Sequence, residues 1–100
     1  MNVNIEKIKE ILDEERGVLS NENLWLLGSQ TDEEIACHSS NIKQHLRYEI
    51  LIESIIHILE KKEYDKLKNS ELRNGIIEMI EFYSKGIPEY SEVLRPLIED

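Results

Sequence analysis

The three histidines are the side chains best suited to chemistry in this chain, and each has a glutamate at helical spacing. His38 and His45 lie seven residues apart, so both face the same side of a continuous helix. The glutamates four residues away are Glu34 for His38, Glu49 for His45 and Glu53 for His57. Such a stripe could bind a metal ion, but the di-iron bundle pattern needs Glu-x-x-His in two helices, and the sequence has none. We interpret these residues as ordinary i, i+4 pairs on a partly solvated face, and predict no metal ligand and no cofactor.

The single cysteine, Cys37, directly precedes His38. Adjacent side chains on a helix point about 100° apart, so this pair cannot form the hydrogen bond that activates a thiol nucleophile. We expect a buried, unreactive cysteine instead. The four glycines are scattered, which leaves no phosphate-binding loop, and the acidic clusters at 13–15 and 32–34 should stay ionised in water. The sequence therefore predicts no catalytic residue and no enzyme, with a metal-dependent or hydrolytic enzyme as the remaining rival.

Net charge separates the classes of partner that this chain could bind. Twenty-one acidic against 12 basic residues give −9 at pH 7, with acidic ends and a nearly balanced middle. Negative potential repels nucleic-acid phosphates and anionic lipid, and attracts a basic protein. The lysine cluster at 61–68 is interleaved with acidic residues, which is typical of a solvated turn. We therefore predict a protein partner rather than nucleic acid or membrane, although the charge could equally serve solubility alone.

The length of 100 residues leaves room for one domain with one core, so we expect a single helical domain over 1–100. One cysteine excludes an internal disulfide and is typical of a reducing compartment. The first 15 residues lack the apolar core of a secretory signal, and the longest apolar-rich stretch, 50–59, is too short to span a bilayer. These features predict a cytoplasmic protein.

The N-terminal part carries apolar residues at helical spacing, which predicts a helix over 3–16 that ends at Gly17. A compact apolar cluster follows at 24–27. Ser20 could cap a short helical turn there, and Gly28 could end it. The acidic cluster at 13–15 would then oppose the helix dipole, a local cost that points mildly to a basic partner.

The middle of the chain predicts one long central helix from about 32 to 62. Thr31 and Glu34 form a capping box, with Glu34 expected to reach back to the N-cap. The polar stretch 38–41 competes for backbone hydrogen bonds, so the helix could be continuous or could break there. Over 50–59 the apolar residues occupy nearly the whole circumference, so we expect contacts on several sides.

Helix boundaries are well marked in the C-terminal third. Ser70 is the expected N-cap of a helix that ends at Gly86. Pro88 suits the first turn of a last helix, and Pro96 should kink or shorten its end. The sequence as a whole predicts an all-α fold, a small four- to five-helix bundle with one long central helix.

Trp25 is the only tryptophan, and its neighbourhood allows two interpretations. Because Phe82 is the only phenylalanine, we favour Trp25 as the main aromatic residue of the core. The alternative is an exposed aromatic anchor surrounded by carboxylates, as a binder of a basic protein surface would present.

In size, acidity and helicity the chain resembles small bacterial immunity and inhibitor proteins that neutralise nuclease toxins, and some phage-encoded inhibitors. No residue-level motif supports this resemblance, so it assigns no functional residue. Our leading hypothesis is a small acidic protein that binds a basic toxin or nuclease and masks its active site. The predicted partner-binding residues are Asp13, Glu14, Glu15, Glu22, Trp25, Asp32, Glu33 and Glu34. The alternative is a small regulatory or structural subunit that forms a homodimer and inhibits nothing.

Overall fold

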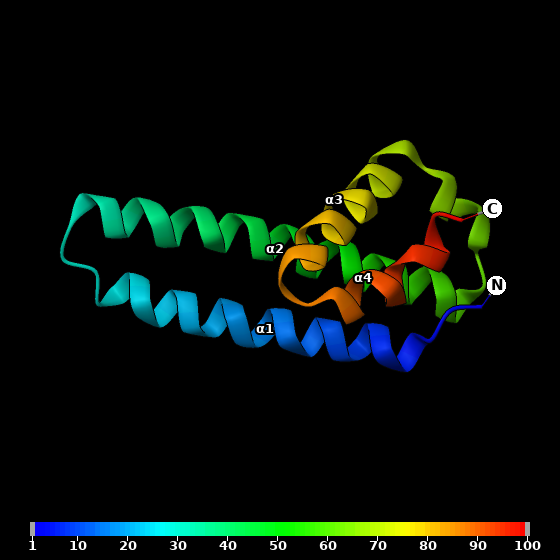
Figure 1. Cartoon of the computed structure of the whole chain (residues 1–100), viewed down its shortest axis with the longest axis horizontal. Helices are drawn as coiled ribbons and strands as arrows, with labels where there is room; N and C mark the ends of the chain where they lie inside the picture. Colours follow the sequence, from blue (N-terminus) through cyan, green and yellow to red (C-terminus); the bar gives the residue numbers. More distant parts are fainter. Residues whose placement is uncertain (1, 100) are drawn as a thin grey trace.

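The computed structural model describes residues 2–99, and within them the regular elements are all helical (Figure 1). The elements are α1 (Ile5–Leu27), α2 (Asp32–Lys61), the 3-10 turn η1 (Tyr64–Lys68), α3 (Ser70–Gly86), α4 (Pro88–Leu94) and the 3-10 turn η2 (Arg95–Leu97). The expected all-α bundle with one long central helix is confirmed, and α2 is that helix.

The helices α1 and α2 form a long antiparallel hairpin, and α3 and α4 cover only one end of it (Figure 1). A 30-residue helix spans about 45 Å, which matches the longest dimension of the molecule, 47 Å, against 22 and 21 Å for the others. We call the uncovered end of the hairpin, residues 19–43, the arm. The molecule is therefore a compact four-helix body from which a two-helix arm extends.

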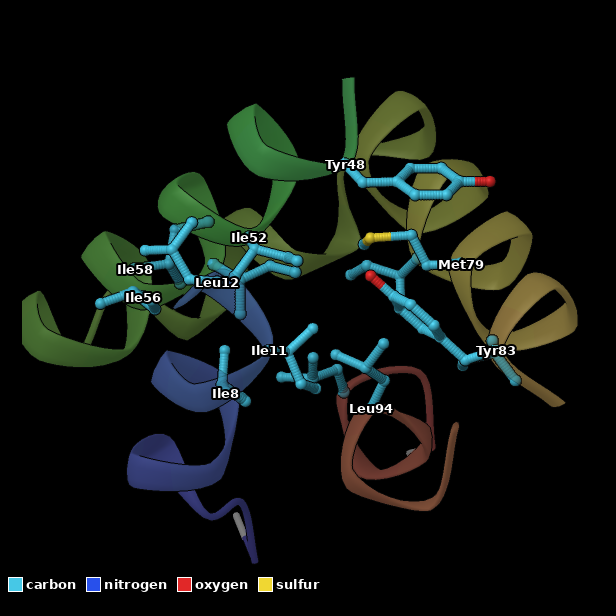
Figure 2. Close-up of a cluster of buried hydrophobic side chains, with 14 of the residues drawn as sticks. Ile8, Ile11, Leu12, Tyr48, Ile52, Ile56, Ile58, Met79, Tyr83 and Leu94 are labelled. Carbon is cyan, nitrogen blue, oxygen red and sulfur yellow. The ribbon is translucent and has the colours of Figure 1, made fainter. Parts of the chain in front are cut away.

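The hydrophobic core lies in the body, where all four helices meet (Figure 2). Its fully buried members are Ile8, Ile11, Tyr48, Ile52, Ile55, Ile76, Met79 and Leu94. Burying a side chain of this size contributes about 1.5–3 kcal/mol each. The core stops short of the arm, so the arm must be held together by other contacts.

The first helix is longer than the sequence predicts, and Gly17 does not end it. Instead α1 continues through Gly17 and Ser20 to Leu27, where Gly28 is the C-cap. The predicted short turn capped by Ser20 is therefore also wrong, whereas the end at Gly28 is confirmed. Packing against α2 outweighs the cost of one exposed glycine, which is about 1 kcal/mol relative to alanine. The acidic residues 13–15 consequently lie in the middle of a helix, where they do not oppose its dipole.

The long helix α2 is continuous through 38–41, which settles the choice left open by the sequence. Its start is confirmed at Thr31, whose Oγ1 accepts a hydrogen bond from the Glu34 N–H at 3.1 Å. The second half of the capping box is shifted by one residue, because the Glu34 carboxylate accepts from the Gln30 N–H at 3.0 Å. Lys62 ends the helix in the left-handed conformation.

The boundaries of α3 and α4 follow the sequence with one correction. The N-cap of α3 is Asn69, whose Oδ1 accepts from the Leu72 N–H at 3.0 Å, and Ser70 is the first helical residue. Asparagine is at least as good a cap as serine, which explains the shift by one position. The predicted end at Gly86 and start at Pro88 are confirmed. A 3-10 turn containing Pro96 replaces the end of α4, as expected.

Replacing Gly17 with alanine should raise the free energy of unfolding by about 0.5–1 kcal/mol. The residue is helical and exposed, and an added Cβ would meet nothing within 4 Å. The matched control is Gly75→Ala, in which the new Cβ would lie 2.8 Å from Leu51 Cδ1, so that crowding offsets the helix-propensity gain. Urea denaturation measures both variants. A Gly17→Ala protein no more stable than the wild type contradicts this account of the extended helix.

Candidate functional site

Two glutamate–histidine pairs lie between α1 and α2. The His45 Nδ1 atom is 2.6 Å from Glu15 Oε2, and the His38 Nδ1 atom is 2.6 Å from Glu22 Oε2. The predicted i, i+4 partners of these histidines on α2 are therefore wrong. Both histidines face the neighbouring helix, and their side chains are only 22% (His38) and 12% (His45) exposed. From this side of α2, the carboxylates within reach are those of Glu15 and Glu22 on α1.

The two pairs share one register of the hairpin. Moving seven residues along α1, from Glu15 to Glu22, moves the partner seven residues back along α2, from His45 to His38. Seven residues are two helical turns, so both pairs lie on the same seam. A polar layer in such a seam specifies which residues face each other. The arm is thus aligned by polar contacts where the body uses apolar ones.

The inner pair belongs to a three-residue network in which Glu15 is the centre. The Tyr83 hydroxyl of α3 donates a hydrogen bond to the Glu15 oxygen that His45 does not contact. Glu15 is 1% exposed, so its carboxylate is removed from water and satisfied by two donors. Burial, and next the adjacent Glu15 carboxylate, raise the pKa of Tyr83 far above its ordinary value. The network joins α1, α2 and α3 at the boundary between the body and the arm.

The outer pair is less deeply buried and lies entirely in the arm. Glu22 is 7% exposed, and its Oε1 accepts a second hydrogen bond from Asn41 Nδ2 at 3.1 Å. The Trp25 ring lies beside the His38 ring, with centroids 5.8 Å apart. The side chains of His38 and Asn41 bond to Glu22 of α1 rather than to their own backbone, and α2 continues unbroken through 38–41.

A cavity of about 410 Å³ opens beside the inner network, between α1 and the end of α3. Its lining includes Val18, His45, Phe82, Tyr83 and Ile87, so most of its wall is apolar. A larger hollow of about 850 Å³ lies near the chain ends and is lined by exposed or half-buried residues, several of them charged. The smaller cavity is the one in contact with buried polar groups.

The structure places six of the eight predicted partner-binding residues on the surface and buries the other two. The exposed residues are Asp13, Glu14, Trp25, Asp32, Glu33 and Glu34. Glu15 and Glu22 are buried and bonded to histidines, so they present no charge to a docked protein. The set of surface carboxylates is corrected accordingly.

Trp25 is 55% exposed, so the interpretation as a core residue is wrong. It lies on the arm, beyond the reach of α3 and α4, and no apolar layer closes over it. Tyr48 and Tyr83 are the buried aromatic residues of the core instead. Cys37 is likewise exposed rather than buried, and it lies at the same uncovered end of the hairpin.

Large apolar side chains gather at the tip of the arm. Leu24, Trp25, Leu27 and Ile35 are 63%, 55%, 85% and 45% exposed. On α2 the spacing places Ile35, Ile42, Leu46 and Ile50 on one face, of which Ile42 alone is half-buried. Exposed apolar groups in such a cluster mark a binding surface more often than isolated ones do.

Exposed carboxylates at the tip, and others on α1 outside the arm, have no basic partner among the described residues. Among residues 2–99, Asp13, Glu14, Asp32 and Glu33 form no ion pair, whereas Glu53 and Glu78 are paired with arginines. Asp32 and Glu33 lie at the tip, and Asp13 and Glu14 lie on α1 near the border of the body. The negative charge of the arm is therefore not neutralised locally within the described chain.

Within residues 2–99 no group of three or more His, Cys, Asp or Glu residues is placed to hold a metal ion. None of the described helices combines the length and the apolar character needed to cross a bilayer.

Comparisons with protein-family models, curated proteins and solved structures gave no match for this chain. Its function must therefore be inferred from the geometry of its own residues.

Proposed function

We propose that this chain is a small acidic protein-binding protein, an immunity or inhibitor protein that neutralises a basic toxin or nuclease by masking its active site. One observation carries the proposal: the arm exposes an aromatic and aliphatic tip beside carboxylates that have no basic partner within residues 2–99. Apolar anchors surrounded by charge are the usual composition of a binding surface for a charged protein.

In the proposed mechanism, charged residues speed the encounter and block the substrate, and apolar residues slow dissociation. Asp32 and Glu33 would occupy the positive groove that normally holds phosphate, which speeds encounter and blocks substrate. Trp25 and its neighbours would then be buried, which slows dissociation. Because the Glu15 and Glu22 contacts already align the hairpin, the arm would lose little conformational freedom on binding.

Trp25→Ala should weaken binding of the basic partner by about 2 kcal/mol, roughly thirtyfold in Kd. The double variant Asp32→Lys, Glu33→Lys should also weaken binding, and it should flatten the dependence of Kd on salt. The partner to test first is a basic protein that copurifies with the chain or is encoded beside it. Isothermal titration at two salt concentrations gives both quantities.

The matched control is Glu71→Lys, Glu81→Lys, which changes the net charge equally but places the change on α3. Both residues are exposed, and neither forms an ion pair within residues 2–99. If the control weakens binding as much as the arm variant, net charge and not the arm is responsible. If a nuclease partner is bound but stays fully active, the inhibitory role is wrong and only binding remains.

A homodimer is the second candidate, and the apolar face of α2 favours it. Ile35, Ile42, Leu46 and Ile50 form a stripe on one helix face, which a second copy could cover. The net charge of −9 on each copy opposes such an association. Sedimentation velocity separates the candidates, since a stable dimer supports the homodimer and a monomer with a tight basic partner supports the inhibitor.

A further inference from the structure

The cavity beside the inner network combines a mostly apolar wall with a His45 ring nitrogen that forms no hydrogen bond within residues 2–99. In the neutral imidazole the His45 Nδ1–H donates a hydrogen bond to the Glu15 carboxylate, and Nε2, which then carries no proton, is an acceptor. No hydrogen bond to Nε2 is formed within residues 2–99. Every fully buried side-chain nitrogen or oxygen of the described residues has a partner, so Nε2 is open to solvent or cavity. His45 lines the cavity.

The walls define what could fill the space. Phe82 and Tyr83 contribute aromatic rings and Val18 and Ile87 aliphatic groups. The volume of about 410 Å³ lies within the usual range of small-molecule sites, which begins near 300 Å³. Phe82 and Ile87 are 36% and 37% exposed, so a bound molecule would cover apolar surface that now faces water.

Charge at this site disfavours an ionic ligand. Glu14 and Lys85 both line the cavity and carry opposite charges, so they do not select either sign. The buried Glu15 carboxylate lies directly behind His45 and would repel an anion placed at Nε2. The same carboxylate orients the imidazole and strengthens Nε2 as an acceptor.

We propose that the cavity between α1 and the end of α3 binds a small, uncharged aromatic molecule whose single hydroxyl group donates a hydrogen bond to His45 Nε2. The ring would contact Phe82 edge-on, and the aliphatic side chains would enclose its far end. This site lies at the border of the body and is independent of protein binding at the tip of the arm.

The test uses 2-naphthol as probe, because its hydroxyl group can donate a hydrogen bond to an acceptor nitrogen. NMR titration should shift the His45 ring signals in a saturable manner. Masking the hydroxyl in 2-methoxynaphthalene should weaken binding about tenfold. The anion 2-naphthoate should bind no more tightly than the methoxy compound.

Two variants and one control complete the experiment. His45→Gln should lower 2-naphthol affinity about tenfold, and the control His57→Gln, at an exposed histidine of the same helix, should leave it unchanged. Val18→Phe keeps the Glu15–His45 pair and fills the cavity, so it should abolish binding even where His45→Gln proves too unstable to test. Absence of saturable binding overturns the proposal, as does equal affinity for the methoxy compound or undiminished binding to Val18→Phe.

Discussion

Replacing Glu15 with alanine is expected to lower the free energy of unfolding by about 3 kcal/mol, although the residue is a glutamate on an otherwise acidic helix. Its carboxylate is 1% exposed and accepts hydrogen bonds from His45 and Tyr83. Alanine would leave both donors buried without an acceptor and would leave a gap at the junction of three helices. Each unsatisfied buried group costs about 1–3 kcal/mol. Urea denaturation followed by far-UV circular dichroism measures the loss.

Two further variants test whether the loss of stability in Glu15→Ala comes from the burial of the carboxylate and not from its charge. Glu14→Ala removes the same charge from the adjacent exposed position and should change stability by less than about 0.5 kcal/mol. Glu22→Ala should give an intermediate loss of about 1–2 kcal/mol, because the partners of Glu22 are partly exposed. A Glu15→Ala protein within about 1 kcal/mol of the wild type would show that the inner network does not stabilise the body.

Stability should fall steeply above about pH 10, where ordinary tyrosines ionise. Burial and the neighbouring Glu15 raise the pKa of Tyr83, so the folded state retains a proton that the unfolded chain releases. The free energy of unfolding then decreases with rising pH, by about 1.4 kcal/mol per pH unit for one such tyrosine. Tyr83 alone should account for about 2 kcal/mol between pH 10 and 12. Burial also raises the pKa of Tyr48 and Tyr90, and both should add to the loss.

The tyrosine variants distinguish this cause from general alkaline denaturation. Tyr83→Phe should be less stable at neutral pH because Glu15 loses a donor, yet its stability should decline less steeply above pH 10. Tyr64→Phe, at an exposed tyrosine, should decline as the wild type does. The ultraviolet absorbance of tyrosinate follows ionisation in the same samples. A Tyr83→Phe protein with the wild-type pH slope would contradict the assignment.

Local sequence signals predicted the parts of the fold that depend on a few neighbouring residues. Thr31 begins α2, Gly86 ends α3 and Pro88 begins α4 as expected, because caps and proline geometry act within one helical turn. Gly17 shows the limit of such signals. Glycine has only a weak local preference for a helix end. Leu19 and Glu22 follow Gly17 in the sequence, and their burial against α2 outweighs that preference.

The candidate site was predicted only in part. The sequence predicted exposed carboxylates as partner-binding residues, and the structure shows six of the eight predicted residues on the surface, but the sequence favoured a core position for Trp25. A core position requires elements that cover the residue, and whether α3 and α4 extend over the arm depends on their packing and not on residues 24–27. Glu15 and Glu22 were predicted as surface carboxylates for a different reason, since their burial depends on how α1 aligns with α2.

From its residues alone the chain is recognisable as helical and acidic, with most helix ends correctly marked, since these properties follow from composition and short-range contacts. The partners of its histidines depend on the alignment of two helices, since Glu15 and His45 are 30 positions apart in the sequence. The matching seven-residue spacings, Glu15 to Glu22 and His38 to His45, were present in the sequence as a signal. Spacing alone does not reveal that the glutamate stripe of α1 faces the histidine stripe of α2, however, because either stripe could have faced solvent. The folded hairpin brings them together, and burial there turns four residues of two ordinarily exposed types, glutamate and histidine, into the pairs that align the arm.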